Sequence, residues 1–144
     1  MLRHLILVLA ILAGLSSCKQ RAQTAGTPVL PKDVADAYSQ LPDKLDYNIH
    51  VKPILSDKCF ACHGPDKNKQ KAGLRLDLSD HAYGPLPESP GKVAIKPGDV
   101  AGSELFHRII SQDAAYLMPT PSSHLSLNAK EKATLIKWIK EGAK

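Results

Sequence analysis

The sequence of 144 residues is poor in aromatic side chains and in cysteines. One Trp, four Tyr and two Phe give a domain of this size little aromatic mass for its core. Three cysteines are too few for a disulfide framework. The sequence has no phosphate-binding glycine motif, no Ser/His/Asp constellation, no paired carboxylate setting and no basic stripe interleaved with aromatics. We therefore expect neither an enzyme nor a nucleic-acid-binding protein.

The N-terminal segment has the pattern of a secretory leader. Arg3 precedes an apolar run at residues 5–15, which is too short to span a bilayer. The run closes with Leu15-Ser16-Ser17-Cys18, which resembles the lipobox of bacterial lipoproteins. We predict a signal peptide at residues 1–17 and a lipidated Cys18, so that the exported protein is anchored to a bacterial membrane on its periplasmic or cell-surface side. The alternatives are an ordinary cleaved signal and an uncleaved anchor.

The part after the leader divides into a tether and one domain. Residues 18–44 are rich in Ala, Thr, Gln and Pro and are predicted to be a flexible tether. Within this stretch, residues 33–41 are expected to form one or two helical turns. The domain is predicted to cover residues 45–144, without an internal repeat.

The pentapeptide Cys59-Phe60-Ala61-Cys62-His63 is the attachment signature of a c-type haem. In such a motif the two thiols bind the porphyrin vinyl groups, and the adjacent imidazole becomes the proximal iron ligand. A structural zinc site would need a second pair of ligands, and a thioredoxin-like redox pair would need a βαβ context. The sequence offers neither. We predict one covalently attached haem c, bound through Cys59 and Cys62 with His63 as its proximal ligand.

Local patterns around the motif predict helices separated by a long loop. A short helix should lead into Cys59 with Pro53 in its first turn, or a longer helix should be kinked there. Gly64-Pro65 ends this segment. Residues 66–98 alternate glycines with prolines and are expected to be irregular. The exception is residues 74–78, whose alternating leucines and charges predict a strand or extended segment along the porphyrin edge.

Two further helices are predicted in the C-terminal half. Asp99 is the expected N-cap of a helix at residues 100–111. The final helix has the clearest pattern, because Asn128 and Glu131 have the spacing of a capping box. Trp138 is a candidate for packing against the haem or for anchoring the final helix to the first, and the second role is preferred. The predicted buried stripe of this helix consists of Leu135, Ile136, Ile139 and Ala143.

The sixth iron ligand has several candidates, of which Met118 is preferred. Met118 is the only methionine after the leader, and Pro119 keeps it out of a helix. A thioether is the soft ligand that complements haem iron in electron carriers. The competing candidates are His50, His81, His107 and His124. Arg75 is a candidate partner for a haem propionate, although a surface position would suit it equally.

The chain carries a set of short motifs in a fixed order. They are Val51-Lys52-Pro53-Ile54-Leu55, the haem motif with Gly64-Pro65-Asp66, Gly73-Leu74-Arg75-Leu76-Asp77, Pro97-Gly98-Asp99, Ser103-Glu104-Leu105, Met118-Pro119 and Trp138-Ile139. From about residue 47 to residue 143 the chain resembles the planctomycete-type cytochrome c domain, a branch of the class I cytochrome c-like fold. The resemblance implies a small all-α fold with long irregular loops wrapped around a covalent haem. It also implies that His63 is proximal and Met118 distal.

These features predict a mono-haem electron carrier that cycles between Fe(II) and Fe(III). Its expected partners are redox proteins, because Lys67, Lys69 and Lys71 follow the motif and lysines near a haem edge steer an acidic partner. A solvated basic loop would explain the same run. Two alternatives stay open for the function. One is a haem-based sensor or gas-binding protein with a displaceable sixth ligand, and the other is a dedicated redox subunit of a periplasmic dehydrogenase.

Overall fold

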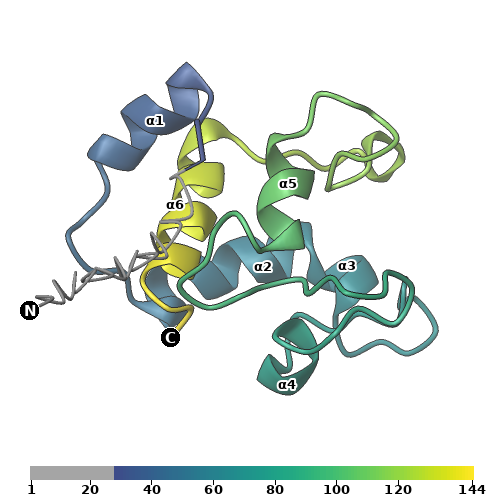
Figure 1. Cartoon of the computed structure of the whole chain (residues 1–144). Helices are drawn as coiled ribbons and strands as arrows, with labels where there is room; N and C mark the ends of the chain where they lie inside the picture. Colours follow the sequence, from purple (N-terminus) through teal and green to yellow (C-terminus); the bar gives the residue numbers. More distant parts are fainter. Residues whose placement is uncertain (1–27) are drawn as a thin grey trace, which may run out of the picture.

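The computed structural model describes residues 28–144, and within this range it consists of helices joined by loops, with isolated β-bridges in place of a sheet (Figure 1). The elements are α1 (Lys32–Ser39), the π-helical turn η1 (Tyr47–Val51), α2 (Lys52–Lys58), α3 (Phe60–His63), α4 (Ser79–Ala82), α5 (Glu104–Ile110), the 3₁₀ turn η2 (Pro121–Ser123) and α6 (Ala129–Lys140). The predicted all-α class with long loops is confirmed. The leader and Cys18 lie outside the described residues.

Helix α6 lies at the centre of the core, and its N-terminus carries the capping box that the sequence predicted. The Asn128 side chain accepts a hydrogen bond from the Glu131 amide, and the Glu131 carboxylate accepts one from the Asn128 amide. This capping box satisfies two amides that the first helical turn leaves without partners. The predicted stripe residues Leu135, Ile136 and Ile139 are buried on α6, and Ala143 is buried beyond the end of the helix at Lys140. Trp138 is also buried and packs on Tyr47, with ring centroids 5.7 Å apart.

Helix α1 lies inside the stretch that was predicted to be a flexible tether. It packs against α6 (Figure 1), and Val34 on its inner face is 1 % exposed and belongs to the hydrophobic core. The few apolar residues of this stretch are therefore enough to dock one short helix. The packed part of the chain extends past the expected boundary at residue 45 and includes α1.

Helix α2 leads directly into the haem motif. Pro53 lies in its first turn, which confirms the first of the two expected arrangements, because an amide there has no helical partner to lose. The π-helical turn η1 precedes it, with Val51 fully buried at the junction. The Cys59 amide donates to the carbonyl of Leu55 at 2.9 Å, so the end of α2 fixes the start of the motif.

Helix α5 begins later than predicted. Its N-cap is Ser103, and the prediction of an Asp99 cap is wrong. The Asp99 carboxylate accepts a hydrogen bond from the Gly102 amide at 2.8 Å and pairs with Lys96 at 2.8 Å, so it stabilises a turn that precedes the helix. The apolar face of α5 is packed in the core, with Leu105, Phe106 and Ile109 buried.

The long segment between α3 and α5 is irregular, as predicted, apart from the short helix α4. Residues 74–78 contain no strand, and Leu76 and Asp77 lie in a turn. The amide of Leu76 donates to the carbonyl of His63 at 2.8 Å, and the amide of Lys71 donates to the carbonyl of Cys62 at 2.9 Å. These bonds fold the segment back onto the motif. No helix in the described part of the chain is long and apolar enough to cross a membrane.

Candidate functional site

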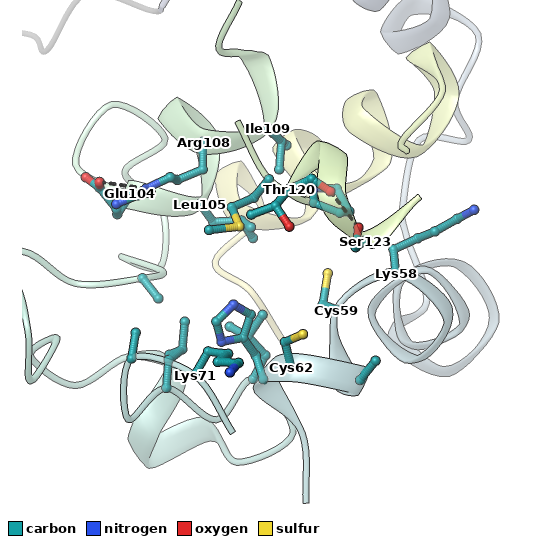
Figure 2. Close-up of a pocket in the computed structure, with 18 of the residues that line it drawn as sticks. Lys58, Cys59, Cys62, Lys71, Glu104, Leu105, Arg108, Ile109, Thr120 and Ser123 are labelled. Atoms are coloured by element: carbon teal, nitrogen blue, oxygen red, sulfur yellow. Dashed lines mark hydrogen bonds and ion pairs between the residues drawn. The ribbon is translucent and has the colours of Figure 1, made fainter. Parts of the chain in front are cut away.

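A cavity of about 640 Å³ lies between the haem motif and α5. This volume falls within the range of about 300–1,000 Å³ that is usual for ligand and cofactor sites. Figure 2 shows Cys59 and Cys62 on one side of the cavity, with Leu105, Ile109 and Thr120 on the other. Most of its surface is apolar. The leucines that line it are Leu74, Leu76, Leu86, Leu105, Leu125 and Leu127.

The first wall of the cavity is the haem motif, which forms one helical turn. The amides of Cys62 and His63 both donate to the carbonyl of Cys59, at 3.1 and 2.8 Å. All three side chains line the cavity, so the turn presents the two thiols and the imidazole together. Gly64 follows, and a Cβ atom at this position would collide with the carbonyl oxygen of Phe60. Only glycine therefore lets the chain leave the turn in this direction.

The Cys59 thiol does not have the properties of a redox nucleophile. Burial, with smaller contributions from the nearby Cys62 and Glu131, raises the pKa of the Cys59 thiol to about 12. A thioredoxin-like nucleophile needs a lowered thiol pKa. Cys59 and Cys62 are free thiols in the structure. Among residues 28–144, no three His, Cys, Asp or Glu side chains gather into a set that would hold a metal ion, so a zinc site has no ligand set there.

The imidazole of His63 is held in an enclosed position. Its Nδ1 atom is buried and makes no hydrogen bond to the described part of the chain. Burial lowers the pKa of His63, which favours the neutral ring. A neutral imidazole is the form that binds a metal ion.

The opposite wall contains Met118, which lines the same cavity as His63. The chain after α5 turns back, so that the amide of Met118 donates to the carbonyl of Arg108 at 3.1 Å. The Met118–Pro119 peptide bond is cis. The four histidines that compete as sixth ligands are absent from the cavity lining. They are His50, His81, His107 and His124.

The two arginines near the site differ in their relation to the cavity. Arg75, a candidate propionate partner for which a surface position was equally expected, forms an ion pair with Asp77 and is not part of the cavity lining. Arg108 lines the cavity, and its Nε atom donates to Glu104 at 3.2 Å (Figure 2). Neither Glu104 nor Arg108 was predicted as a site residue. Their i,i+4 spacing on one predicted helix was the signal that could have drawn attention to the pair.

The residues present fit a covalently bound haem c. Two thiols and one imidazole share a wall, a thioether lies in the other, and the remaining surface is largely apolar. The thiols suit thioether bonds to the porphyrin, and the imidazole and thioether are common axial ligands of haem iron.

Comparison with known proteins agrees with this chemistry. The family model described as Planctomycete cytochrome C matches residues 59–122. No curated protein and no solved structure matches the chain significantly. The matched stretch begins at Cys59 and ends shortly after Met118, so it contains both walls of the cavity. The match supports a planctomycete-type cytochrome c domain at residues 59–122, and this family suggests haem-based electron transfer.

Proposed function

We propose that this protein is a mono-haem electron carrier and not an enzyme. Cys59 and Cys62 bind the haem covalently, His63 is the proximal ligand and Met118 is the distal ligand. The observation that carries the proposal is that one cavity collects these four side chains and none of the competing histidines. An iron with six protein and porphyrin ligands suits electron transfer, because no position is left open for a substrate.

The side chains around the cavity have separate tasks in this function. Haem c supplies a one-electron Fe(II)/Fe(III) couple when it is bound. Leu74, Leu76 and Leu105 exclude water from the cavity and so tune the reduction potential. Arg108 replaces Arg75 as the proposed partner of a propionate, because it lines the cavity and its Nη groups are not used in the bond to Glu104.

We also propose where the carrier works. The leader at residues 1–17 and the small residues before Cys18 support export and lipid anchoring. The lysines after the motif support an acidic redox partner, since Lys71 lines the cavity and Lys69 is exposed beside it. Replacing Cys18 by Ala should release the haem protein from the membrane fraction into the soluble fraction. Retention of the Cys18→Ala variant in membranes would contradict lipid anchoring.

Optical spectroscopy of the matured protein tests the ligands. The pyridine haemochrome assay should show one covalently held haem per chain. The oxidised protein should be low-spin, with the weak far-red band of a thioether–iron bond. Met118→Ala should abolish that band, whereas Leu117→Ala, a change of the neighbouring half-buried side chain outside the cavity lining, should retain it. A wild-type protein without covalent haem would refute the proposal.

The same preparation separates the carrier from a sensor. A reduced carrier with Met118 bound should react slowly with carbon monoxide, and Met118→Ala should react fast. A high-spin wild-type spectrum with fast carbon monoxide binding would instead favour a gas-binding protein. Rapid electron exchange with one dehydrogenase and no other partner would favour the dedicated redox subunit.

A further inference from the structure

Glu104, in the first turn of α5, is a buried carboxylate at the edge of the cavity. Its side chain is only 9 % exposed. Three donors surround the carboxylate: Lys92 Nζ at 3.1 Å, Arg108 Nε at 3.2 Å and the hydroxyl group of Tyr116. Burial alone would raise the pKa of Glu104, but the hydrogen bonds from Tyr116, Lys92 and Arg108 together lower it. The charged carboxylate is therefore the stable form in the folded protein.

Tyr116 is held on its ring as well as on its hydroxyl group. The guanidinium carbon of Arg108 lies 4.0 Å from the centre of the Tyr116 ring, which is a close cation–π contact. Lys92 Nζ approaches the same ring at 5.9 Å. Glu104 thus fixes both cations that contact the ring, in addition to accepting the tyrosine hydrogen bond.

The residue two positions after Tyr116 is Met118. The chain leaves α5, turns at Asp113, and returns along the helix. The amides of Tyr116 and Leu117 donate to the carbonyl of Asp113 at 3.0 and 2.8 Å. The amide of Met118 then donates to the carbonyl of Arg108, one of the last carbonyls of α5, which have no partner inside the helix. The segment is attached to α5 at both ends, through side chains at Tyr116 and through backbone at Met118.

We propose that Glu104 is a positioning residue for the sixth ligand. Through Tyr116 and Arg108 it holds the returning segment against α5, and so it determines how readily Met118 leaves the cavity. This inference rests on the proposed role of Met118 as the distal ligand. It gives a function to the buried charge of Glu104, which the haem motif itself does not explain.

The size of the effect follows from the bonds that a single substitution removes. Tyr116→Phe deletes the hydroxyl group that donates to Glu104 and leaves the ring contacts in place. A hydrogen bond to a buried charged group contributes enough that its loss should raise the open population of the segment roughly tenfold. Glu104→Gln keeps an acceptor for Tyr116 but removes the charge that fixes Lys92 and Arg108, so it should have an effect of similar direction.

The experiment uses the full-length, haem-loaded protein and two measurements. Imidazole titration of the oxidised protein reports how easily an external ligand replaces Met118. Hydrogen exchange reports the protection of the Met118 amide. Tyr116→Phe should bind imidazole about tenfold more tightly and exchange the Met118 amide about tenfold faster. The double variant with Glu104→Gln should change both by less than the product of the single effects, because both substitutions break one network.

Tyr83→Phe is the matched control. The Tyr83 hydroxyl group also donates a hydrogen bond, to the carbonyl of Ala143 at 2.6 Å, but Tyr83 is not part of the cavity lining. This variant should lower the thermal midpoint and leave imidazole affinity and Met118 exchange within about twofold of the wild type. Equal effects of Tyr116→Phe and Tyr83→Phe on Met118 exchange would overturn the proposal. A wild-type spectrum without a thioether–iron band would refute Met118 ligation, and the exchange comparison would still decide whether Glu104 holds the segment.

Discussion

The two walls of the cavity are held by different kinds of interaction. The wall of Cys59, Cys62 and His63 is one turn of helix, in which backbone bonds join residues three or four positions apart. The wall of Met118 is a loop, and the side chains that hold it come from three separate segments. The first wall is therefore determined locally by the sequence, and the second depends on the folded arrangement around it.

This difference suggests which wall opens first. Backbone bonds within a helix that continues from α2 are lost only when the helix unfolds. A loop held by one buried carboxylate can separate from its neighbours while the core stays intact, because local openings involve the parts with the fewest buried contacts. We expect substitutions in the first wall to affect whether haem is attached at all. Substitutions in the second wall should affect how firmly the iron keeps its sixth ligand.

The largest expected effect comes from removing both thiols. Cys59→Ala with Cys62→Ala should abolish covalent haem attachment, because no other thiol lines the cavity in the described part of the chain. Haem staining of the protein on a denaturing gel measures this directly. Cys18→Ala should keep the stain at the wild-type level. Stain retained by the double variant would show that the motif is not the attachment site.

A smaller but still severe effect is expected at Gly64. Gly64→Ala places a Cβ atom against the backbone of Phe60 and should destabilise the first wall by about 2 kcal/mol or more. The free energy of unfolding in denaturant and the yield of haem-loaded protein should both fall.

Gly91→Ala is the control for this substitution. Gly91 has a φ angle of +81° and no heavy atom within 4 Å of an added Cβ, so alanine there introduces backbone strain without a collision. The expected cost is about 1 kcal/mol with normal haem attachment. Equal losses in both variants would show that the collision at Gly64 is relieved by a small shift of the chain.

The stability of the second wall should decrease in acid, because Glu104 becomes protonated. The folded-state pKa of Glu104 lies below its ordinary value of 4.5, so the carboxylate contributes stability that is fully present above that pH. This contribution is lost as the pH falls through the folded-state pKa. The groups that face the carboxylate are Lys92, Arg108 and Tyr116, and both cations stay charged throughout this range.

Denaturant unfolding at pH 7 and below pH 4 tests this dependence. At pH 7, Glu104→Gln should be less stable than the wild type by about 1–2 kcal/mol, and the difference should shrink in acid. Glu88→Gln changes an exposed carboxylate that also lines the cavity, and it should follow the wild type at both pH values. A constant gap between Glu104→Gln and the wild type would contradict a stabilising charge at this site.

The contrast between the walls also explains what could be predicted from the sequence. The haem motif, the first turn of α2 with Pro53 and the capping box of α6 are local patterns, and each was found where it was expected. The presence of Met118 in the cavity is consistent with its predicted role. These features depend on residues within a few positions of each other, which periodicity and capping rules describe well.

The features that the sequence did not predict depend either on a competing local turn or on contacts between distant residues. Asp99 has the side chain of a helix cap, but the turn closed by its bond to Gly102 delays the start of α5. The docking of α1 is determined by its packing against α6, almost one hundred positions later in the sequence. The pairing of Glu104 with Tyr116 spans twelve positions and crosses a loop, so no periodic pattern in the sequence predicts it.

The smallest predicted effect separates the two arginines. Arg108 lines the cavity, so Arg108→Gln removes a positive charge near the haem and should lower the reduction potential by roughly 30–50 mV, because a nearby cation favours the reduced iron. Arg75→Gln removes a charge from an ion pair with Asp77 that lies outside the cavity lining, and its shift should be clearly smaller. Redox titration of both variants, each with its haem content verified, measures the difference. A larger shift of the reduction potential in Arg75→Gln would indicate that Arg75 pairs with the propionate. The segment after the haem motif, and not α5, would then neutralise the haem edge.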